Sequence, residues 1–441
     1  MINKDDIKLK SYEVIDKNSI KLIELAKTIS RNAETGFREF NTSELVKKWF
    51  DELNIKHQDN IAITGVNGIV NSMKDGPTIS VIGELDSNIV PGHPEGNPET
   101  GAGHACGHQI QIANMIAVAV AVTKANILDN ISGSINFMAI PAEEYIELEF
   151  RKTLKDNGQI KYLTGKGEFI RLGLFDNVDI AFMTHATSDN NYGKLLIPSG
   201  NNGLIAKKIE FIGISSHAGT DPHNGINALN AANLSLQAIH MLRETFKDND
   251  TIRVHPIITK GGAAVNQVPD SVHVETYIRA KTLDAVLQTN NKIDKAIKHC
   301  ALALGAKVKI SNLGGMLPMI NDSNLSNIYK ENSEVIVGKE NVKNKEHSGG
   351  STDMGDVSHL IPSIHPYVTG ASGSHHTHNF KIEDYDLTVI TAAKAMLGTL
   401  IDILYDDAKL GNKIISEHKA KLTKNEYLDI MDNLYSENLY Q

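Results

Sequence analysis

The sequence of 441 residues contains only two cysteines, Cys106 and Cys300, and its first ten residues, MINKDDIKLK, are rich in charge. Two cysteines cannot form the disulfide framework of a small secreted protein. The charged start also lacks the apolar stretch of a secretory signal peptide. We therefore expect the protein to reside in the reducing cytoplasm.

Long hydrophobic runs and positive charge are also lacking. The most apolar segment, residues 110–122, is shorter than a membrane span of roughly 20 residues and contains Gln111 and Asn114, so it predicts a buried helix. The 53 Asp and Glu outnumber the 44 Lys and Arg, which gives a net charge of −9. Such a surface is a poor partner for nucleic acids and for anionic membranes, and we expect neither.

The length is about three times that of a typical domain of roughly 150 residues, which predicts more than one folding unit. Apolar, strand-like runs end in polar residues at 78–86, 134–144 and 178–186, with helical segments between them. This alternation predicts an α/β fold. Residues 203–313 then follow the order strand, helix, strand, strand, helix, strand, which is typical of a ferredoxin-like unit.

The sequence returns to αβ segments after this unit, so the ferredoxin-like unit interrupts one larger α/β domain. The predicted organisation is a large domain in two parts, an inserted domain between them, and a charged C-terminal tail. Their bounds are 1–202 and 314–405 for the large domain, 203–313 for the insert, and 406–441 for the tail. The last six residues, SENLYQ, resemble the remnant of a cleavage tag, and we assign them no function.

Polar residues follow the predicted strands at a place where ligands bind in α/β proteins. The strands end at Asp86, at Glu143 with Glu144, and at His185. Ligands of open α/β sheets bind beyond the carboxyl ends of the strands, so we expect these side chains at one edge. An isolated histidine such as His185 can also be an ordinary strand-end residue, but its acidic neighbours favour a site.

The segment GHACGHQ places Cys106 and His108 two residues apart, between glycines that let the backbone bend. In an extended or turn segment both side chains can reach one cation, and thiolate and imidazole are common metal ligands. The alternative is that Cys106 is a small buried apolar residue and that His108 is hydrogen-bonded at a helix start. A further imidazole, His104, favours the metal site.

Two adjacent carboxylates, Glu143 and Glu144, follow an apolar strand, where two charges are costly unless a cation or a proton compensates them. One can bind a metal while the other acts as a general base. Alternatively, both lie at the solvated start of an acidic helix. The run SGSHHTHNF offers His375, His376 and His378, which the pattern cannot rank, and a surface histidine cluster is the alternative.

These residues resemble the dinuclear-metal aminoacylase and carboxypeptidase family of metallopeptidases. The similarity is to its amidohydrolase branch, with aminobenzoyl-glutamate hydrolase, indoleacetyl-amino-acid hydrolases and aminoacyl dipeptidases, and it covers roughly residues 20–400. The motifs that carry it, in the family's order, are HACGH (104–108), PAEE (141–144), the strand-end His185, SSHAGTDPHNGINAL (215–229), GGAAVNQVPD (261–270), GGSTDMGDVS (349–358) and HTHNF (376–380).

The resemblance implies a metallopeptidase catalytic domain with a central mixed sheet and two divalent metal ions per subunit, zinc or manganese. It implies attack by a water that bridges these ions, with Glu143 as the general base. It selects His376 from its cluster because the family's ligand precedes an aromatic residue, here Phe380, by four positions. The implied metal ligands are Cys106, His108, Glu144, His185 and His376.

The resemblance also implies that the inserted domain is a lid and the contact of a homodimer. His217 matches a catalytic histidine that reaches the other subunit's active site and polarises the scissile carbonyl. Asn266 and Arg279 match positions that hold the substrate, and a guanidinium group suits a free carboxylate. Asp86 and Asp353 are implied to support the site without binding metal.

The expected function is hydrolysis of the amide bond of a small molecule with a free carboxylate: an N-acyl amino acid, an aminobenzoyl-glutamate-like conjugate or a dipeptide. Two departures from the family pattern, Gln109 and the long loop 87–103, leave the substrate open. Two other functions remain as alternatives. One is a thiol hydrolase with Cys106 as nucleophile, which leaves the paired glutamates unexplained, and the other is a catalytically inactive binding protein of the same fold.

Overall fold

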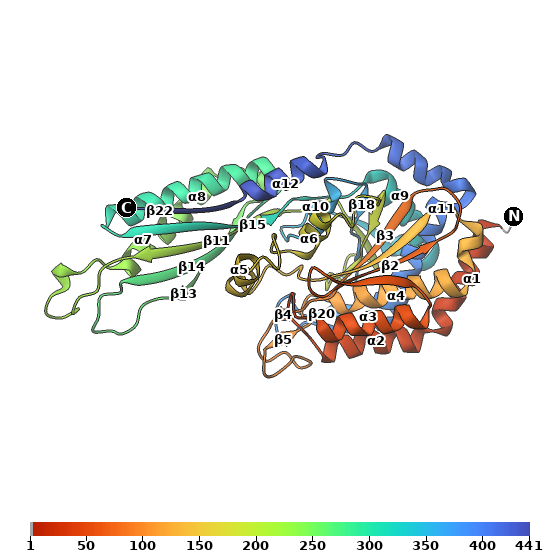
Figure 1. The fold of residues 1–441 in the computed structure, drawn as a ribbon, viewed down its shortest axis with the longest axis horizontal. Coiled ribbons are helices and arrows are strands. Elements are labelled where there is room, and N and C mark those ends of the chain that lie inside the picture. The colour runs from red at the N-terminus through yellow and green to blue at the C-terminus, as the bar shows by residue number, and fades with distance from the viewer. Residues whose placement is uncertain (1–2) are drawn as a thin grey trace. The chain divides into compact units, whose positions relative to one another are not determined.

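The computed structural model describes residues 3–441, which form two compact units (Figure 1). Unit 1 comprises the residues up to Gly200, Ile320–Glu346 and Asp356–Thr423. Unit 2 comprises Asn201–Met319, His347–Gly355 and Lys424–Gln441. The main part of unit 2 is therefore inserted into the chain of unit 1.

Unit 1 contains a six-stranded mixed sheet with the order β1-β2-β6-β3-β7-β18. The first three strands pair antiparallel, and β6, β3, β7 and β18 pair parallel. β-branched and aromatic residues favour these strands, as in TISVIGE of β3 and SINFMAI of β6. The α/β class with a mixed sheet is confirmed. The bounds are β1 Lys56–Ile61, β2 Gly65–Asn71, β3 Thr78–Glu84, β6 Ser134–Ile140, β7 Ile180–Phe182 and β18 Ser363–Ile364.

Shorter strands of unit 1 form a second sheet with the order β17-β9-β19-β8, and two small hairpins. In the second sheet, β8 continues from β7 after a short break. The bounds are β8 His185–Ala186, β9 Leu195–Pro198, β17 Val342–Lys345 and β19 Tyr367–Val368, with the hairpins β4 Asn88–Ile89 with β5 Ala102–Gly103, and β20 Ala371–Ser372 with β21 Lys381–Ile382.

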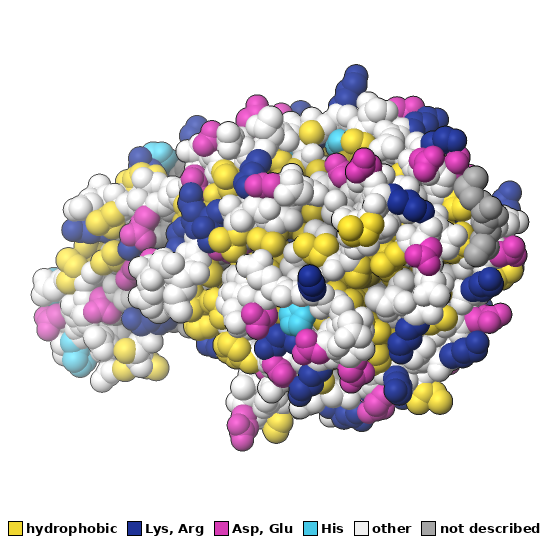
Figure 2. Space-filling model, turned by 45° about the vertical axis from the view of Figure 1, so that its right-hand side comes forward, with side chains coloured by type: hydrophobic (Ala, Val, Ile, Leu, Met, Phe, Trp, Pro, Cys, Tyr) yellow, Lys and Arg dark blue, Asp and Glu magenta, His cyan; other side chains and the backbone are white. Residues whose placement is uncertain are grey.

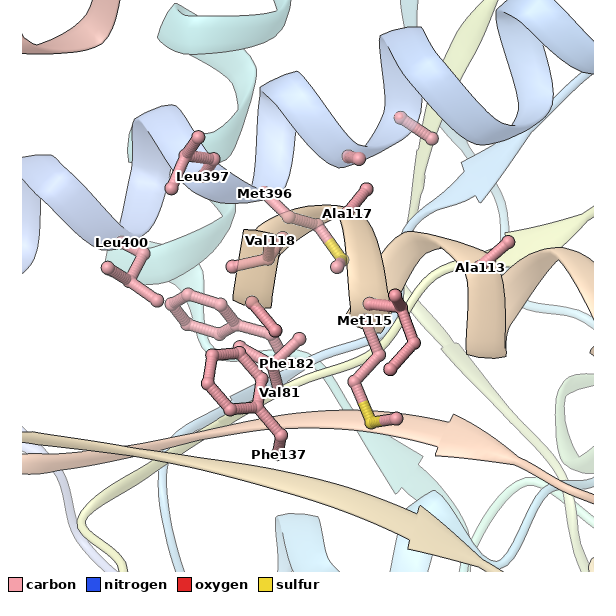
Figure 3. Packing of buried hydrophobic residues seen from close by; sticks show 14 of the residues in the cluster. Val81, Ala113, Met115, Ala117, Val118, Phe137, Phe182, Met396, Leu397 and Leu400 are labelled. Carbon is pink, nitrogen blue, oxygen red and sulfur yellow. The ribbon is translucent and has the colours of Figure 1, made fainter. Parts of the chain in front are cut away.

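Helix α4 (His108–Lys124) is the central helix of unit 1, and its residues from His108 to Val122 are buried. This confirms the buried helix predicted for residues 110–122. Figure 3 shows α4 packed between the sheet on one side and helix α11 (Ala392–Glu417) on the other. The side chains labelled there are Val81, Phe137 and Phe182 of the sheet, Ala113, Met115, Ala117 and Val118 of α4, and Met396, Leu397 and Leu400 of α11.

The remaining helices include α1 and α2, which follow one another directly near the N-terminus. Helices α1 and α2 both contact α4. Their bounds, with those of the other helices, are α1 Lys4–Lys17, α2 Ser19–Arg31, α3 Phe40–Glu52, α5 Leu148–Asp156, α6 Gly165–Leu172, α9 Ser323–Val337 and α10 Met354–Ser358.

One helical segment among residues 3–441, Asp386–Glu417, is long and apolar enough to cross a membrane by length and composition alone. Its most apolar window is 78% buried inside the protein. The backbone also leaves the helical conformation at Tyr405, and Asp406, Asp407 and Ala408 are left-handed. These features are typical of a core helix.

Unit 2 contains an antiparallel sheet with the order β12-β14-β11-β15-β22, and β13 also pairs with β14. Along the chain, strand β11 is followed by α7, two short strands, β14, α8 and β15. Apolar side chains between helices and sheet, such as Phe211, Val272 and Ile293, form its core. The bounds are β11 Gly203–Ile212, α7 Ala228–Met241, β12 Arg253–Val254, β13 Ile257–Lys260, β14 Ser271–Ala280, α8 Leu283–Ala303 and β15 Lys307–Met316.

Residues 406–441 do not form the separate tail that we expected. Helix α11 continues to Glu417, whereas α12 (Lys424–Asn433) and strand β22 (Tyr435–Tyr440) belong to unit 2. Apolar side chains such as Tyr427 and Met431 are buried among the charged residues of α12. Strand β22, which includes most of SENLYQ, pairs antiparallel with β15, because an edge strand offers unpaired backbone groups to a further strand.

Charged side chains of both signs are interspersed on the face shown in Figure 2. Apolar side chains lie between them. This mixture agrees with the modest net charge of −9.

Candidate metal centre

The turn before α4 presents the first two candidate ligands. Cys106 precedes Gly107, whose φ is +90°, and His108 is the first residue of the helix. A Cβ on Gly107 would lie 2.6 Å from the Cβ of Ala186, so close packing and the left-handed backbone both require glycine. The turn therefore brings a thiol and an imidazole to the carboxyl end of the sheet.

The other candidate ligands come from distant segments. Glu144 follows β6, and His185 begins β8. His376 has a left-handed backbone with a φ of +61°, and its N–H donates to the carbonyl oxygen of Ala105 at 2.8 Å. This hydrogen bond ties the loop of His376 to the turn that carries Cys106.

These side chains form two potential ligand groups that share Cys106. In one group the donor atoms of Cys106, His108 and His185 lie within 4.8 Å of one another, and in the other those of Cys106, Glu144 and His376 do so. The Sγ atom of Cys106 is 3.4 Å from Nε2 of His185, and Nε2 of His376 is 3.3 Å from Oε1 of Glu144. Thiolate, imidazole and carboxylate together suit a divalent transition metal.

Two atoms in these groups lack hydrogen-bond partners among the described residues. They are Nε2 of His108 and Oε1 of Glu144, and both are buried. Each has an ion-pair contact, with Oε2 of Glu84 at 3.1 Å and with Nε2 of His376 at 3.3 Å, but neither contact has hydrogen-bond geometry. An unsatisfied buried polar atom is costly, and such an atom calls for an explanation. Lone pairs on these two atoms fit coordination to a divalent cation.

The charges of the cluster favour the metal-binding form of Cys106. Burial disfavours ionisation of its thiol, and so does the negative charge of Glu144. The neighbouring imidazoles, first His185 and then His376, outweigh both effects and hold the pKa of the thiol well below its usual value. A thiolate is the form of cysteine that binds metal.

The ionised form of Glu144 is favoured for a similar reason. Burial disfavours its charge, but the imidazole of His376 holds the pKa of the carboxyl well below its usual value. Its N–H donates to Oδ2 of Asp86 at 2.9 Å. The position of Glu144 is therefore fixed through both its backbone and its side chain.

Asp86 contacts a second candidate ligand as well. Its carbonyl oxygen lies 2.9 Å from Nδ1 of His108, and its Oδ1 lies 3.4 Å from the same nitrogen. With the proton assigned to Nδ1, His108 directs the lone pair of Nε2 towards the cluster. Asp86 thus orients both His108 and Glu144, and a supporting role for it stays our prediction.

Glu143 is buried beside the cluster. It belongs to neither group that contains Cys106, but with Glu84 and His108 it forms a third potential ligand group. Its Oε2 lies 3.8 Å from Nε2 of His108. The preceding residue, Ala142, is left-handed with a φ of +57°. Glu143 is therefore close to the candidate metal positions and shares the neighbour His108 with the first of them.

The structure adds Glu84, which the sequence analysis left without a role. It receives hydrogen bonds from Lys166 and from Nε2 of Gln111, and its Oε2 is 3.1 Å from Nε2 of His108. Burial opposes its charge, but the Lys166 ammonium and then His108 hold the pKa of Glu84 at about 2. Its position on β3, two residues before Asp86, was the available signal.

Further histidines surround His185. The ring of His375 stacks on it with centroids 5.7 Å apart, and the ring of His365 meets it edge-on at 5.6 Å. His365 and His104 are buried, whereas His378 is exposed. His365 could not be selected from the sequence, because a single histidine between apolar residues carries no pattern.

The family assignment follows from a comparison with protein-family models. The model of peptidase family M20/M25/M40 matches residues 85–402, which include the whole cluster. The chain belongs to this family. It is therefore a hydrolase that acts on amide or peptide bonds, as the motifs predicted.

Curated relatives of this M20-family chain cover most of its length. The Xaa-Arg dipeptidase of Mus musculus is 30% identical over 341 residues, which are 74% of this chain and 72% of that protein. The N-acetylcysteine deacetylase of Bacillus subtilis (strain 168) is 22% identical over 393 residues, which are 86% of this chain and 97% of that protein.

A solved structure shows the same fold. The Bacillus subtilis YXEP protein, a dinuclear metal binding peptidase from the M20 family, has a TM-score of 0.65 and 19% identity. The similarity covers 87% of this chain and 98% of that one.

The other predicted site residues of this M20-family chain lie in unit 2. His217 and Asn266 are exposed, and their segments pair, since the N–H of Ala218 donates to the carbonyl oxygen of Asn266 at 3.0 Å. Arg279 lies on β14 and is partly exposed, and Asp353 is buried. The roles of these four residues stay predictions.

Proposed function

We propose that this chain is a metal-dependent amidohydrolase that cleaves an N-acyl amino acid, an aminobenzoyl-glutamate-like conjugate or a dipeptide. The observation that carries the proposal is the shared position of Cys106 in two ligand groups. A second observation supports it, because Nε2 of His108 and Oε1 of Glu144 are buried without hydrogen-bond partners. The proposed ligands are Cys106, His108, Glu144, His185 and His376.

The proposed cofactors are two divalent ions, zinc or manganese. When bound, they supply positive charge that polarises a water molecule and the scissile carbonyl. The thiolate of Cys106 favours zinc, whereas the carboxylate and imidazole ligands also accept manganese. The M20 relative described as a dinuclear metal binding peptidase supports the proposal of two ions.

Glu143 is the proposed general base. Its carboxylate lies next to the ligand Glu144 in sequence, but it is outside both groups that contain Cys106. It can therefore accept a proton from water and later donate it to the leaving amine. Buried carboxylates beside a charged centre are well suited to such proton transfer.

Unit 2 is the proposed ferredoxin-like lid and homodimer contact, with His217 acting in the active site of the other subunit. Nδ1 of His217 accepts hydrogen bonds from the N–H groups of Gly219 and Thr220, both at 3.1 Å. Its proton is then on Nε2, which can donate to a carbonyl oxygen as negative charge develops. Asn266 and Arg279 are proposed to hold the substrate, and Asp353 to support the site.

The proposed substrate class rests on a chemical feature that is common to the substrates named by the relatives. A dipeptide and an N-acylated cysteine, named by the relatives above, both leave a carboxylate beside the amide bond. Arg279 can bind such a group in bidentate fashion. We also propose a cytoplasmic location, where Cys106 would remain reduced.

Elemental analysis of tag-free protein, combined with a substrate panel, tests the proposal. We expect about two metal ions per chain, hydrolysis of at least one N-acetyl amino acid, aminobenzoyl-glutamate or dipeptide, and loss of activity on chelation that zinc or manganese restores. Activity that survives chelation but not alkylation of Cys106 would identify a thiol hydrolase. A chain that binds no metal and hydrolyses none of these substrates would instead be a catalytically inactive binding protein.

A further inference from the structure

Ala142 has an unusual backbone conformation directly before the two glutamates of the candidate centre. Its φ is +57°, and its side chain is fully buried. The left-handed region is unfavourable for a residue with a Cβ, and such residues persist only where the surrounding structure holds them. The contacts of Ala142 should therefore show what holds it.

Both polar backbone groups of Ala142 have partners from distant segments. Its N–H donates to Oε1 of Glu39 at 2.8 Å, across 103 positions of the sequence. Its carbonyl oxygen accepts a hydrogen bond from Nη1 of Arg151 at 3.3 Å, and the same nitrogen donates to the carbonyl oxygen of Leu163 at 2.6 Å. Glu39 and Arg151 are both fully buried.

Gly36 packs against the Cα and Cβ atoms of Ala142. A Cβ added at Gly36 would lie 2.9 Å from both Cα and Cβ of Ala142 and 2.3 Å from Nη2 of Arg151. Contacts this short with backbone and with a buried side chain leave no room for a larger residue. Ala142 is thus enclosed at its N–H, its carbonyl and its side chain.

Glu39 is itself held rigidly. Its Oε2 accepts a hydrogen bond from the hydroxyl of Thr64 at 2.6 Å. Burial, and then the negative charge of Asp86, raise the pKa of Glu39 to about 8. A second buried carboxyl group beside Asp86 lowers the stability of the fold. A residue that is kept at such a cost is typical of a functional site.

We propose that Glu39 is a positioning residue that, with Arg151 and Gly36, holds the left-handed backbone of Ala142 so that Glu143 and Glu144 enter the metal centre in the required directions. Asp86 holds the following turn from the other side, at the N–H of Glu144. The inference rests on the proposed function for the roles of the two glutamates. Glu39 contacts neither substrate nor metal in this scheme.

A rescue experiment tests the proposal. Glu39→Ala should lower kcat by ~10²-fold with little change in KM, because small displacements of catalytic groups have effects of this size. It should also weaken metal binding by ~10–100-fold, as loss of an outer hydrogen-bond partner does. Glu39→Gln retains a carbonyl acceptor for the N–H of Ala142 and should retain most of the activity and affinity.

The decisive variant is Glu39→Ala combined with Ala142→Gly. Glycine adopts a left-handed backbone without strain, so the double variant should recover most of the kcat and metal affinity that Glu39→Ala loses. Glu168→Ala is the matched control, because Glu168 is also a fully buried carboxylate that accepts backbone N–H bonds, from Lys161 and Tyr162. It should lower the melting temperature without lowering kcat.

Three results would overturn the proposal: a kcat and metal affinity of Glu39→Ala equal to those of the native chain, failure of Ala142→Gly to rescue it, or an equal loss of kcat in Glu168→Ala. Failure of the proposed function can be told apart from failure of this proposal, because the native chain would then hydrolyse no substrate. In that case the metal affinities of the same variants test the positioning role of Glu39. If the native chain binds no metal either, the crystal structure of Glu39→Ala tests the positioning role of Glu39. The proposal expects a negative φ at residue 142, and an unchanged positive φ would contradict it.

Discussion

The candidate residues of unit 1 and those of unit 2 are held in different ways. In unit 1, His376 is exposed, but Cys106, His108 and Glu144 are buried, and each has polar neighbours that fix its charge or direction. In unit 2, Asp353 is buried, but His217 and Asn266 are exposed in segments held mainly by backbone hydrogen bonds. The first arrangement is organised before any ligand binds, whereas the second leaves side chains available to a ligand.

This difference separates two kinds of effect. Substitutions among the buried residues of unit 1 should change metal binding, turnover or both. Substitutions at the exposed residues of unit 2 should change turnover while metal content stays the same. A substitution in unit 2 that removes metal would contradict this division.

The largest effect is expected for Glu144→Ala. It removes one ligand and leaves His376 without its carboxylate partner, which lies 3.3 Å away. Metal affinity should fall by more than the ~10–100-fold that loss of an outer partner causes, and turnover should fall with it. Competition with a metal indicator measures the affinity. Native metal content in this variant would remove Glu144 from the ligand set.

Glu143→Gln should separate turnover from metal binding within unit 1. The amide is nearly the same size as the carboxylate but cannot accept the proton, so kcat should fall by ~10²–10⁴-fold. Metal content should stay at the native value, because Glu143 is outside both groups that contain Cys106. Elemental analysis and steady-state kinetics on one preparation check both points. A loss of metal would show that the two adjacent glutamates share the ligand role.

His217→Ala tests unit 2. Loss of one donor to the developing oxyanion should lower kcat by ~10²–10³-fold. Metal content should not change, because the side chain is exposed in a different unit from the cluster. His240→Ala is the matched control, since His240 is an exposed histidine on α7 of the same unit. Equal kcat in the two variants would remove His217 from the mechanism.

Local patterns in the sequence predicted the parts of the structure that depend on nearby residues. Apolar runs predicted strands β3 and β6, and the apolar segment 110–122 predicted the buried helix α4. Strands β6, β3 and β7 are neighbours in the sheet, so the polar residues that follow them come to the same edge. The positions of Asp86 and Glu144 were predictable for this reason.

Contacts between distant residues were not predictable in the same way. Glu39 and Ala142 are 103 positions apart, and Glu84 and Lys166 are 82 positions apart. No periodicity connects such pairs, because their contact depends on how whole elements pack. Strand β22 was missed for a similar reason: its charged sequence gives a weak strand signal, and its partner is the edge of β15.

The smallest effect concerns a carboxylate of unit 1 that is paired with lysines rather than with imidazoles. Oδ1 of Asp402 lies 2.7 Å from the ammonium groups of both Lys4 and Lys8. Burial disfavours its charge, but the two lysines and Asn332 lower the pKa of Asp402 below its usual value. The ion pairs therefore stabilise the folded state above the unfolded pKa, near 3.9, and the stabilisation is lost as the pH falls through the lower folded pKa.

Asp402→Asn should accordingly lower the free energy of unfolding by ~1 kcal/mol at pH 7, since its partners are partly exposed and screened by solvent. Chemical unfolding of both chains between pH 7 and pH 3 measures this, and the difference between them should shrink towards the acidic end. Metal affinity and kcat should not change, because Asp402 is in neither ligand group. A loss of metal in Asp402→Asn would show that the ion pairs between the helices of unit 1 also affect metal binding. Burial of the ligands alone would then not explain why substitutions in the two units have different effects.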